Sequence, residues 1–407
     1  MAQGGGRANN RTLVLLLGST QTLSWASSVY LPAVLAPAMA ADLAVDPPAV
    51  FAAFSAALVV TALLGPKAGR LIDQRGGRQV LGGSHIVFAL GLAALAWAPS
   101  LAWMWAAWLW LGVGMALGLY EGAFATIVRI KGRDAKTAIT GVTLIAGFAS
   151  TVGWPLSAWM ATAWGWREAC LAWAALHLLL GLPLAACLPG RGVRAADVVA
   201  ADAQPAAAAP AATSVASQSA VPWRVTALLA FAFAACGFVT SAVASHLPQL
   251  LQLQGLSLGE AVMVGALIGP SQVAARLLDF VALRSASPLW SARLAALAHA
   301  AAVLLLWGLG NKAAPAFGVV HGAGNGVLTI ARGTLPLQLY GPAGYGRQMG
   351  WIHAPGRFAQ ALAPWGFGWC MQWWGGAAFG LTLALSLLAG GALLVLGWKA
   401  PAAEHTT

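Results

Sequence analysis

Ionisable side chains that interrupt apolar stretches are the best candidates for chemistry in this chain. Arg357 lies inside the apolar stretch 346–373, with His353 four residues before it and Gln360 three residues after it. At 3.6 residues per helical turn, this spacing places the three polar groups on one helix face. A guanidinium can hold a carboxylate through two parallel hydrogen bonds, so the trio predicts a site for a small organic anion. The alternative is an arginine bonded to backbone carbonyls that neighbouring prolines leave unpaired.

A second arginine, Arg276, interrupts the stretch 257–281, and two alignments with the earlier stretch 48–69 place it differently. Matching Asp279 to Asp73 puts Arg276 at the cytoplasmic surface, whereas matching the predicted helix starts buries it about a turn deeper. We favour the deeper position, which makes Arg276 a second group for the anion. A local ion pair with Asp279, three residues on, is the alternative.

The remaining candidates are scattered over other apolar stretches. Glu121 is either a proton carrier or the permanent partner of an arginine, and both readings stay open. His321 and Asn325 share a helix face by their i, i+4 spacing, although packing is the commoner role of a lone buried histidine. The further candidates for contact with a substrate are Tyr30, Tyr120 and His246.

The elements that must position these residues are membrane helices. Charged residues make up 8% of the chain and apolar ones 59%, with a mean hydropathy of +0.75, which excludes an ordinary soluble domain. A span needs about 20 apolar residues. Twelve stretches qualify, at 13–39, 48–69, 79–98, 101–128, 137–162, 168–188, 223–250, 257–281, 288–310, 313–333, 346–373 and 376–397.

The basic residues orient these spans. Of the 22 Lys and Arg, only Arg167 and Lys312 fall in predicted outer loops; apart from Arg276 and Arg357, the others, Arg332 among them, fall in cytoplasmic segments or at cytoplasmic helix ends. The positive-inside rule therefore places both termini in the cytoplasm, and the net charge of +11 reflects topology rather than a nucleic-acid surface. The four cysteines lack CxxC spacing, so we expect no metal site and no cofactor.

A segment rich in Ala, Pro and Ser, 189–222, divides the chain into two parts that resemble each other. It cannot bury a core, so we expect a disordered cytoplasmic linker between six-helix units at 1–188 and 223–407. Thr126-Ile-Val-Arg129 parallels Thr329-Ile-Ala-Arg332, and two further matches occur in corresponding spans. The sequence therefore predicts an all-α fold of two pseudo-symmetric six-helix bundles.

The loop between the second and third spans carries a motif. It reads GRLIDQRGGR, with Gly69, Asp73, Gly76 and Arg78 at the spacing G-x-L-x-D-x-x-G-x-R. This pattern resembles the signature loop of the major facilitator superfamily. The resemblance implies a twelve-helix secondary transporter that works by alternating access. It also implies that the loop acts as a conformational latch, with Asp73 facing a helix N-terminus or Arg78.

Two branches of that superfamily offer a weaker resemblance. Monocarboxylate transporters and oxalate/formate antiporters use an arginine on helix 8 for a carboxylate, where Arg276 stands, and the antiporters add a cation on helix 11, where Arg357 stands. The chain departs from the monocarboxylate pattern at Gln272, which occupies the position of an aspartate. It also lacks the adjacent Gly-Pro of the drug/proton antiporter motif.

These observations predict a monomeric transporter of the cell inner membrane that moves a mono- or dicarboxylate, with protons carried through Glu121 as an option. An exporter of drugs or hydrophobic metabolites on the same fold is the nearest alternative, and a non-transporting membrane sensor is another. An enzyme is disfavoured because the chain carries no HExxH, nucleophile or nucleotide-binding motif. We expect a small-molecule substrate and the lipid bilayer as partners, and no nucleic acid.

Overall fold

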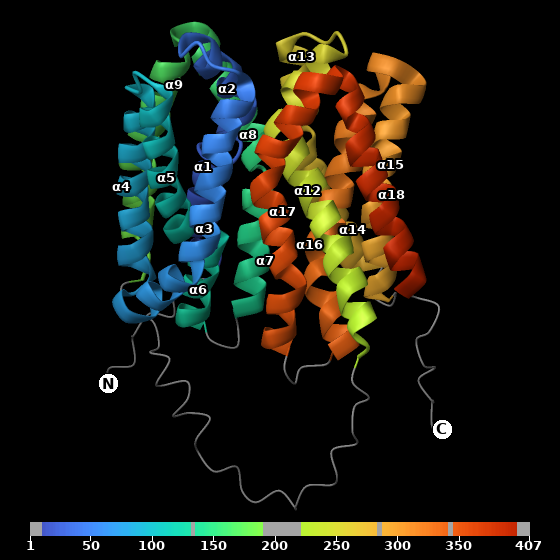
Figure 1. The fold of residues 1–407 in the computed structure, drawn as a ribbon. Coiled ribbons are helices and arrows are strands. Elements are labelled where there is room, and N and C mark those ends of the chain that lie inside the picture. The colour runs from blue at the N-terminus through green and yellow to red at the C-terminus, as the bar shows by residue number, and fades with distance from the viewer. Residues whose placement is uncertain (1–9, 132–134, 190–220, 283–286, 341–344, 397–407) are drawn as a thin grey trace, which may run out of the picture. The chain divides into compact units, whose positions relative to one another are not determined.

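The computed structural model describes residues 10–131, 135–189, 221–282, 287–340 and 345–396, which form helices and no strands (Figure 1). The chain separates into two compact units, Met1–Ala220 and Val221–Thr407. The predicted linker, 189–222, lies almost wholly outside the described residues. Within each unit the long helices run side by side, as expected where every backbone polar group must be satisfied inside a bilayer.

The first unit contains more helix breaks than the sequence predicts. The stretch 13–39 forms two helices rather than one, because the chain leaves the helix after Ala26 and restarts at Leu31, where Pro32 occupies the first turn. The stretch 101–128 likewise divides at Leu119. The helices are α1 Asn10–Ala26, α2 Leu31–Asp42, α3 Pro47–Arg75, α4 Gly77–Ala96, α5 Leu101–Gly118, α6 Tyr120–Lys131, α7 Ala135–Ala146, α8 Ala149–Trp164, α9 Trp166–Leu176, the π-helical turn His177–Gly181 and α10 Leu182–Ala186.

The second unit has longer uninterrupted helices. They are α12 Trp223–Leu253, α13 Leu258–Ala266, α14 Ile268–Ala282, α15 Pro288–Leu309, the 3₁₀ turn Gly310–Ala313, α16 Ala314–Tyr340, α17 Tyr345–Trp374, the 3₁₀ turn Gly375–Ala378 and α18 Phe379–Leu396. Buried alanines of α15, including Ala292, Ala295 and Ala296, allow close contact with its neighbours. Small residues at such interfaces are typical of membrane helices.

The described helices include ten runs that are long and apolar enough to cross a membrane. The run Pro288–Tyr340 contains the predicted spans 288–310 and 313–333, and the run Ile352–Leu396 covers most of 346–373 and 376–397. The twelve predicted stretches therefore all correspond, within a few residues, to apolar helices of the structure. The chain is a multi-pass membrane protein.

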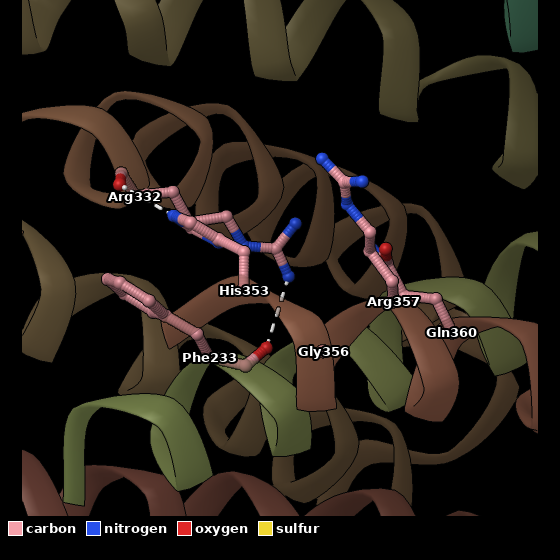
Figure 2. Close-up of a pocket in the computed structure, with 6 residues that line it drawn as sticks. All are labelled: Phe233, Arg332, His353, Gly356, Arg357 and Gln360. Carbon is pink, nitrogen blue, oxygen red and sulfur yellow. Dashed lines mark hydrogen bonds between the residues drawn. The ribbon is translucent and has the colours of Figure 1, made fainter. Parts of the chain in front are cut away.

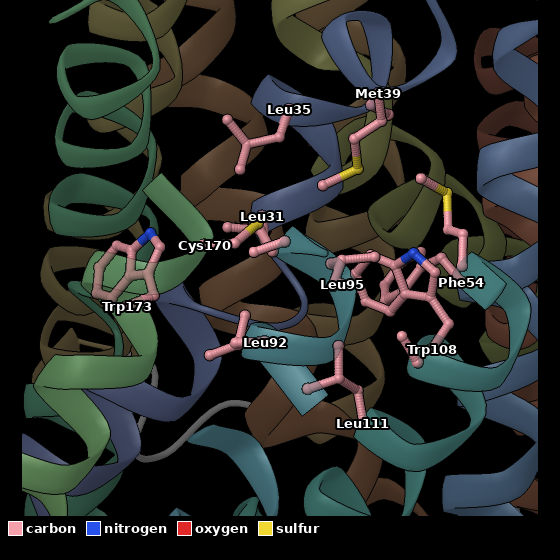
Figure 3. Close-up of a cluster of buried hydrophobic side chains, with 14 of the residues drawn as sticks. Leu31, Leu35, Met39, Phe54, Leu92, Leu95, Trp108, Leu111, Cys170 and Trp173 are labelled. Atoms are coloured by element: carbon pink, nitrogen blue, oxygen red, sulfur yellow. The ribbon is translucent and has the colours of Figure 1, made fainter. Parts of the chain in front are cut away.

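Large aromatic side chains fill the core of the first unit. Trp108, Trp173 and Phe54 are almost fully buried, and Figure 3 shows them among leucines of α2, α4 and α5. The indole nitrogen of Trp173 donates to the Ser157 hydroxyl at 3.0 Å, which satisfies its one donor. Trp108 and Trp173 thus belong to the core of this unit.

The motif loop connects α3 to α4 through one special backbone position. Gly76 has a φ of 90°, in the left-handed region that favours glycine. The Arg129 guanidinium donates to the main-chain carbonyl of Asp73 and ties α6 to the end of α3. The Asp73 carboxylate makes no hydrogen bond or ion pair with the described residues, so the contact here is made by the backbone. The latch role of Gly69, Asp73, Gly76 and Arg78 stays a prediction.

Close packing beside this loop gives a testable stability difference between two glycines of α4. A Cβ at Gly77 would lie 2.1 to 2.6 Å from the Thr126 side chain, whereas nothing lies within 4 Å of one at Gly83. We expect Gly77→Ala to destabilise the protein by about 1–3 kcal/mol through overpacking. Gly83→Ala should be neutral or stabilising, because alanine favours helices. Thermal unfolding in detergent checks this, and equal melting temperatures would contradict it.

Candidate functional site

A pocket in the second unit is lined by two arginines, Arg332 and Arg357. It has a volume of about 200 Å³ and is formed by α12, α16 and α17 (Figure 2). Its lining residues are Phe233, Arg332, His353, Gly356, Arg357 and Gln360. Four of them come from α17 at positions i, i+3, i+4 and i+7, which is one helix face. His353, Arg357 and Gln360 therefore line one pocket, as their spacing predicts.

Arg332 was missed as a site residue, and the prediction that its helix ends beside it, at residue 333, is wrong. Helix α16 continues for eight residues beyond it, to Tyr340, and its half-buried side chain enters the pocket. One terminal nitrogen donates to the Phe233 carbonyl at 3.2 Å, while Nε is buried without a hydrogen-bond partner among the described residues. A sequence signal existed, since apolar residues follow Arg332 whereas basic residues follow its counterpart Arg129.

Prolines in the pocket walls explain several of the polar side chains. Pro336 has no N–H, so the carbonyl of Arg332 loses its helical donor, and His353 Nε2 donates to it at 3.2 Å. In the same way Pro364 leaves the Gln360 carbonyl unpaired, and the Ser241 hydroxyl donates to it at 2.8 Å. These bonds hold α12, α16 and α17 together around the pocket.

The bond to a carbonyl also fixes the orientation of His353. A carbonyl only accepts, so Nε2 carries a proton and Nδ1 is left to accept a bond or to take a second proton. The ring stacks on Phe233 with centroids 5.6 Å apart and planes inclined by 4°. His353 therefore has one structural role already, in addition to lining the pocket.

The electrostatics of the pocket favour an anion. Two guanidiniums, of Arg332 and Arg357, line it, and none of its six lining residues is acidic. Taking a cation out of water is costly unless an opposite charge or several hydrogen bonds compensate. A small oxyanion bound between the arginines would supply both.

Gly237 of α12 leaves space for the side chains of Arg332 and Gln360, and this close packing gives a second prediction. A Cβ there would lie 2.9 Å from a terminal nitrogen of Arg332 and 3.1 Å from Cγ of Gln360. Gly237→Ala should displace the guanidinium and weaken anion binding by roughly tenfold, the loss of about one charged hydrogen bond. Gly366→Ala is the matched control on α17, because nothing lies within 4 Å of its Cβ position. Ligand titrations of both variants check this, and unchanged binding in Gly237→Ala would contradict it.

Arg276 lies outside this pocket, in a polar cluster between α14 and α16. Gln272 Oε1 accepts from Arg276 at 3.1 Å and from Asn325 at 3.3 Å, and Arg276 reaches the Thr329 hydroxyl at 3.4 Å. Asp279 bonds Ser291 at 2.7 Å and forms no ion pair with Arg276. Arg276 is six residues from the end of α14, about 9 Å along the axis. Its role in substrate binding, with that of Asn325, stays a prediction.

The other predicted histidines have partners of their own. His246 is buried and lies 2.7 Å, through Nε2, from the Pro364 carbonyl, which joins α12 to α17. His321 is buried against His299 and stacks on Phe317. Neither lines the pocket around Arg332 and Arg357.

The candidates of the first unit form a separate group. Tyr30 and Tyr120 both pack against Trp25, with centroids 6.4 and 4.9 Å from it. Glu121 begins α6, and its carboxylate lies against Gly65 of α3, where a Cβ would contact it. The proton-carrying role of Glu121 and the substrate contacts of both tyrosines stay predictions.

Comparison with known proteins gives one family match and several solved structures of similar fold. The model of the Major Facilitator Superfamily matches residues 17–317. No protein of curated function matches the sequence. Among solved structures, the nucleoside transporter NupG superposes with a TM-score of 0.72 at 14% identity, covering 95% of this chain and 100% of that one. A bacterial homologue of the human lysosomal transporter Spinster, inward-facing and occupied, gives 0.66 at 14% identity, covering 96% and 95%. At this identity the structures show a shared fold.

Proposed function

The chain belongs to the major facilitator superfamily, and on that premise we propose that it is a secondary transporter of a small organic anion, a mono- or dicarboxylate. Transport proceeds by alternating access. In this proposal both termini lie in the cytoplasm, the protein works as a monomer in the cell inner membrane, and its small-molecule substrate binds through Arg332 and Arg357.

The observation that carries the proposal is the pair of guanidiniums in a pocket whose lining residues include no acid. Arg332 is half-buried, and none of the residues that line the pocket with it carries a negative charge, so a bound anion would compensate the charge of its guanidinium. A carboxylate is the ligand that two guanidinium forks match in geometry and charge.

The size of the pocket supports a small substrate over a drug. Sites for drug-sized ligands usually measure ~300–1,000 Å³. This pocket measures about 200 Å³, which suits an acid of a few carbons. The exporter of drugs or hydrophobic metabolites is the alternative that a transport assay has to exclude.

Counterflow in proteoliposomes tests the proposal. Vesicles loaded with unlabelled lactate or succinate should accumulate the labelled acid, while empty-vesicle controls should not. A nucleoside and a drug-like cation, tested in the same way, should show no exchange. Exchange of the cation or the nucleoside and of neither acid would overturn the anion assignment.

A further inference from the structure

A pair of buried histidines joins α15 to α16 in the second unit. His299 Nδ1 and His321 Nδ1 are 3.1 Å apart, and the two side chains are 1% and 3% exposed. Gly324 lets the helices approach here, since a Cβ on it would lie 3.3 Å from the His299 ring. Two facing Nδ1 atoms can bond only if one carries a proton and the other does not. The pair therefore holds one proton between its rings when both are neutral.

The bonding of this pair is incomplete. His299 Nε2 is buried and has no hydrogen-bond partner among the described residues. Leaving a buried polar atom unpaired costs about 1–3 kcal/mol, so natural proteins seldom keep one without a function. If His299 donates through Nδ1, its Nε2 is a basic nitrogen with an open lone pair. It can take one more proton, and the resulting charge is shared with His321 through the existing bond.

A second buried pair, in the first unit, shows what a fully bonded arrangement looks like. His85 Nδ1 and His177 Nδ1 are 2.8 Å apart, and His177 Nε2 lies 2.7 Å from the Ser27 hydroxyl. That hydroxyl donates to the Leu23 carbonyl at 2.8 Å, so it accepts from His177. His177 is thus bonded through both nitrogens, which suits a structural role.

The His299–His321 pair is also linked to the anion pocket. Among the described residues, His321 and Arg332 are the groups that act electrostatically on His299. Helix α18, which packs on α15, carries no ionisable side chain. The other described Lys, Arg, His, Asp and Glu side chains on α15, α16 and the elements packed against them are exposed, bonded elsewhere or in the pocket: Arg224, His246, Glu260, Arg276, Asp279, Arg293, Lys312, His353 and Arg357.

We propose that the His299–His321 pair is the proton-binding site that couples anion transport to protons. This inference rests on the proposed anion site. While the anion site is empty, the positive charge of Arg332 disfavours the positive charge that His299 would gain on binding a proton. A carboxylate bound to Arg332 cancels this repulsion, so the anion and one proton bind together. The reciprocity of coupled binding then requires the anion to bind more tightly as the pH falls.

Proton uptake on anion binding tests this assignment. Purified protein in weakly buffered detergent with a pH-indicator dye receives lactate or succinate at a pH where the acid is fully ionised. Wild type should take up about one proton per anion bound, and its affinity should change by up to about tenfold per pH unit. His299→Gln and His321→Asn should still bind the anion while taking up no proton. His85→Gln, the matched control, should behave as wild type.

The outcomes separate this inference from the proposed function. Anion binding without proton uptake in wild type overturns the coupling site and leaves the anion site standing. Uptake that survives in both variants of the second unit, or is lost in His85→Gln instead, also overturns it. Failure of wild type to bind either acid removes the anion site, and the coupling proposal with it. Ligand-induced thermal stabilisation shows that each variant is folded.

Discussion

Replacing Arg332 by glutamine is expected to abolish measurable anion transport. The side chain lines the pocket, and it is the half-buried one of the two guanidiniums there. A hydrogen bond to a charged group is worth about 1.5–3 kcal/mol, so loss of one such bond lowers affinity roughly 10- to 150-fold. If the anion accepts two hydrogen bonds from Arg332, the loss of binding free energy would be twice as large. Equilibrium binding of lactate and succinate, together with counterflow, measures it.

The same substitution should leave the fold intact, which separates a binding role from a structural one. Arg332 holds an uncompensated charge in the pocket wall, so its removal should preserve or raise the melting temperature of the ligand-free protein. Arg224→Gln, at the exposed start of α12, removes one positive charge of the same unit without touching the pocket. A large fall in ligand-free stability with unchanged binding would show that Arg332 is structural.

Arg357→Gln is expected to have the second largest effect, a loss of affinity within the same 10- to 150-fold range. Its side chain lies on the pocket face of α17, and it is exposed, so part of the attraction is screened by water. We therefore expect a smaller loss than for Arg332→Gln, and one that shrinks further at high salt. Titrations at two salt concentrations measure both features.

The conservative variant shows what Arg357 contributes. Arg357→Lys keeps the charge but loses the planar fork, so partial rescue would indicate simple attraction and no rescue would indicate paired hydrogen bonds. If Arg357→Gln leaves transport of an acid unchanged, Arg357 is not a binding residue. If it leaves efflux of a drug-like cation intact, the exporter alternative gains support.

The fold could be predicted from the sequence because membrane spans depend on long apolar stretches. The breaks within them could not be predicted as easily. Between Ala26 and Leu31 the chain leaves the helix within a long apolar stretch, and only two serines, Ser27 and Ser28, and the following Pro32 hint at the break. The composition of a segment indicates whether it can lie in lipid, whereas contacts with other helices determine where the helix breaks.

The candidate site was predictable only where one helix carries it. His353, Arg357 and Gln360 could be grouped because helical spacing is a local property. Arg332 was missed because it was assigned to the end of its predicted span, and its place beside α12 and α17 depends on how these helices pack. The His299–His321 pair escaped prediction because it depends on which two helices are neighbours.

The most direct test of the anion assignment is a thermal-shift titration of the purified wild-type protein against small carboxylic acids, a nucleoside and drug-like cations. A ligand present at one hundred times its dissociation constant stabilises a protein by about 2.7 kcal/mol. The proposed function predicts a saturable rise in melting temperature with a mono- or dicarboxylate, and none with the cations or the nucleoside. Stabilisation by cations alone would contradict it.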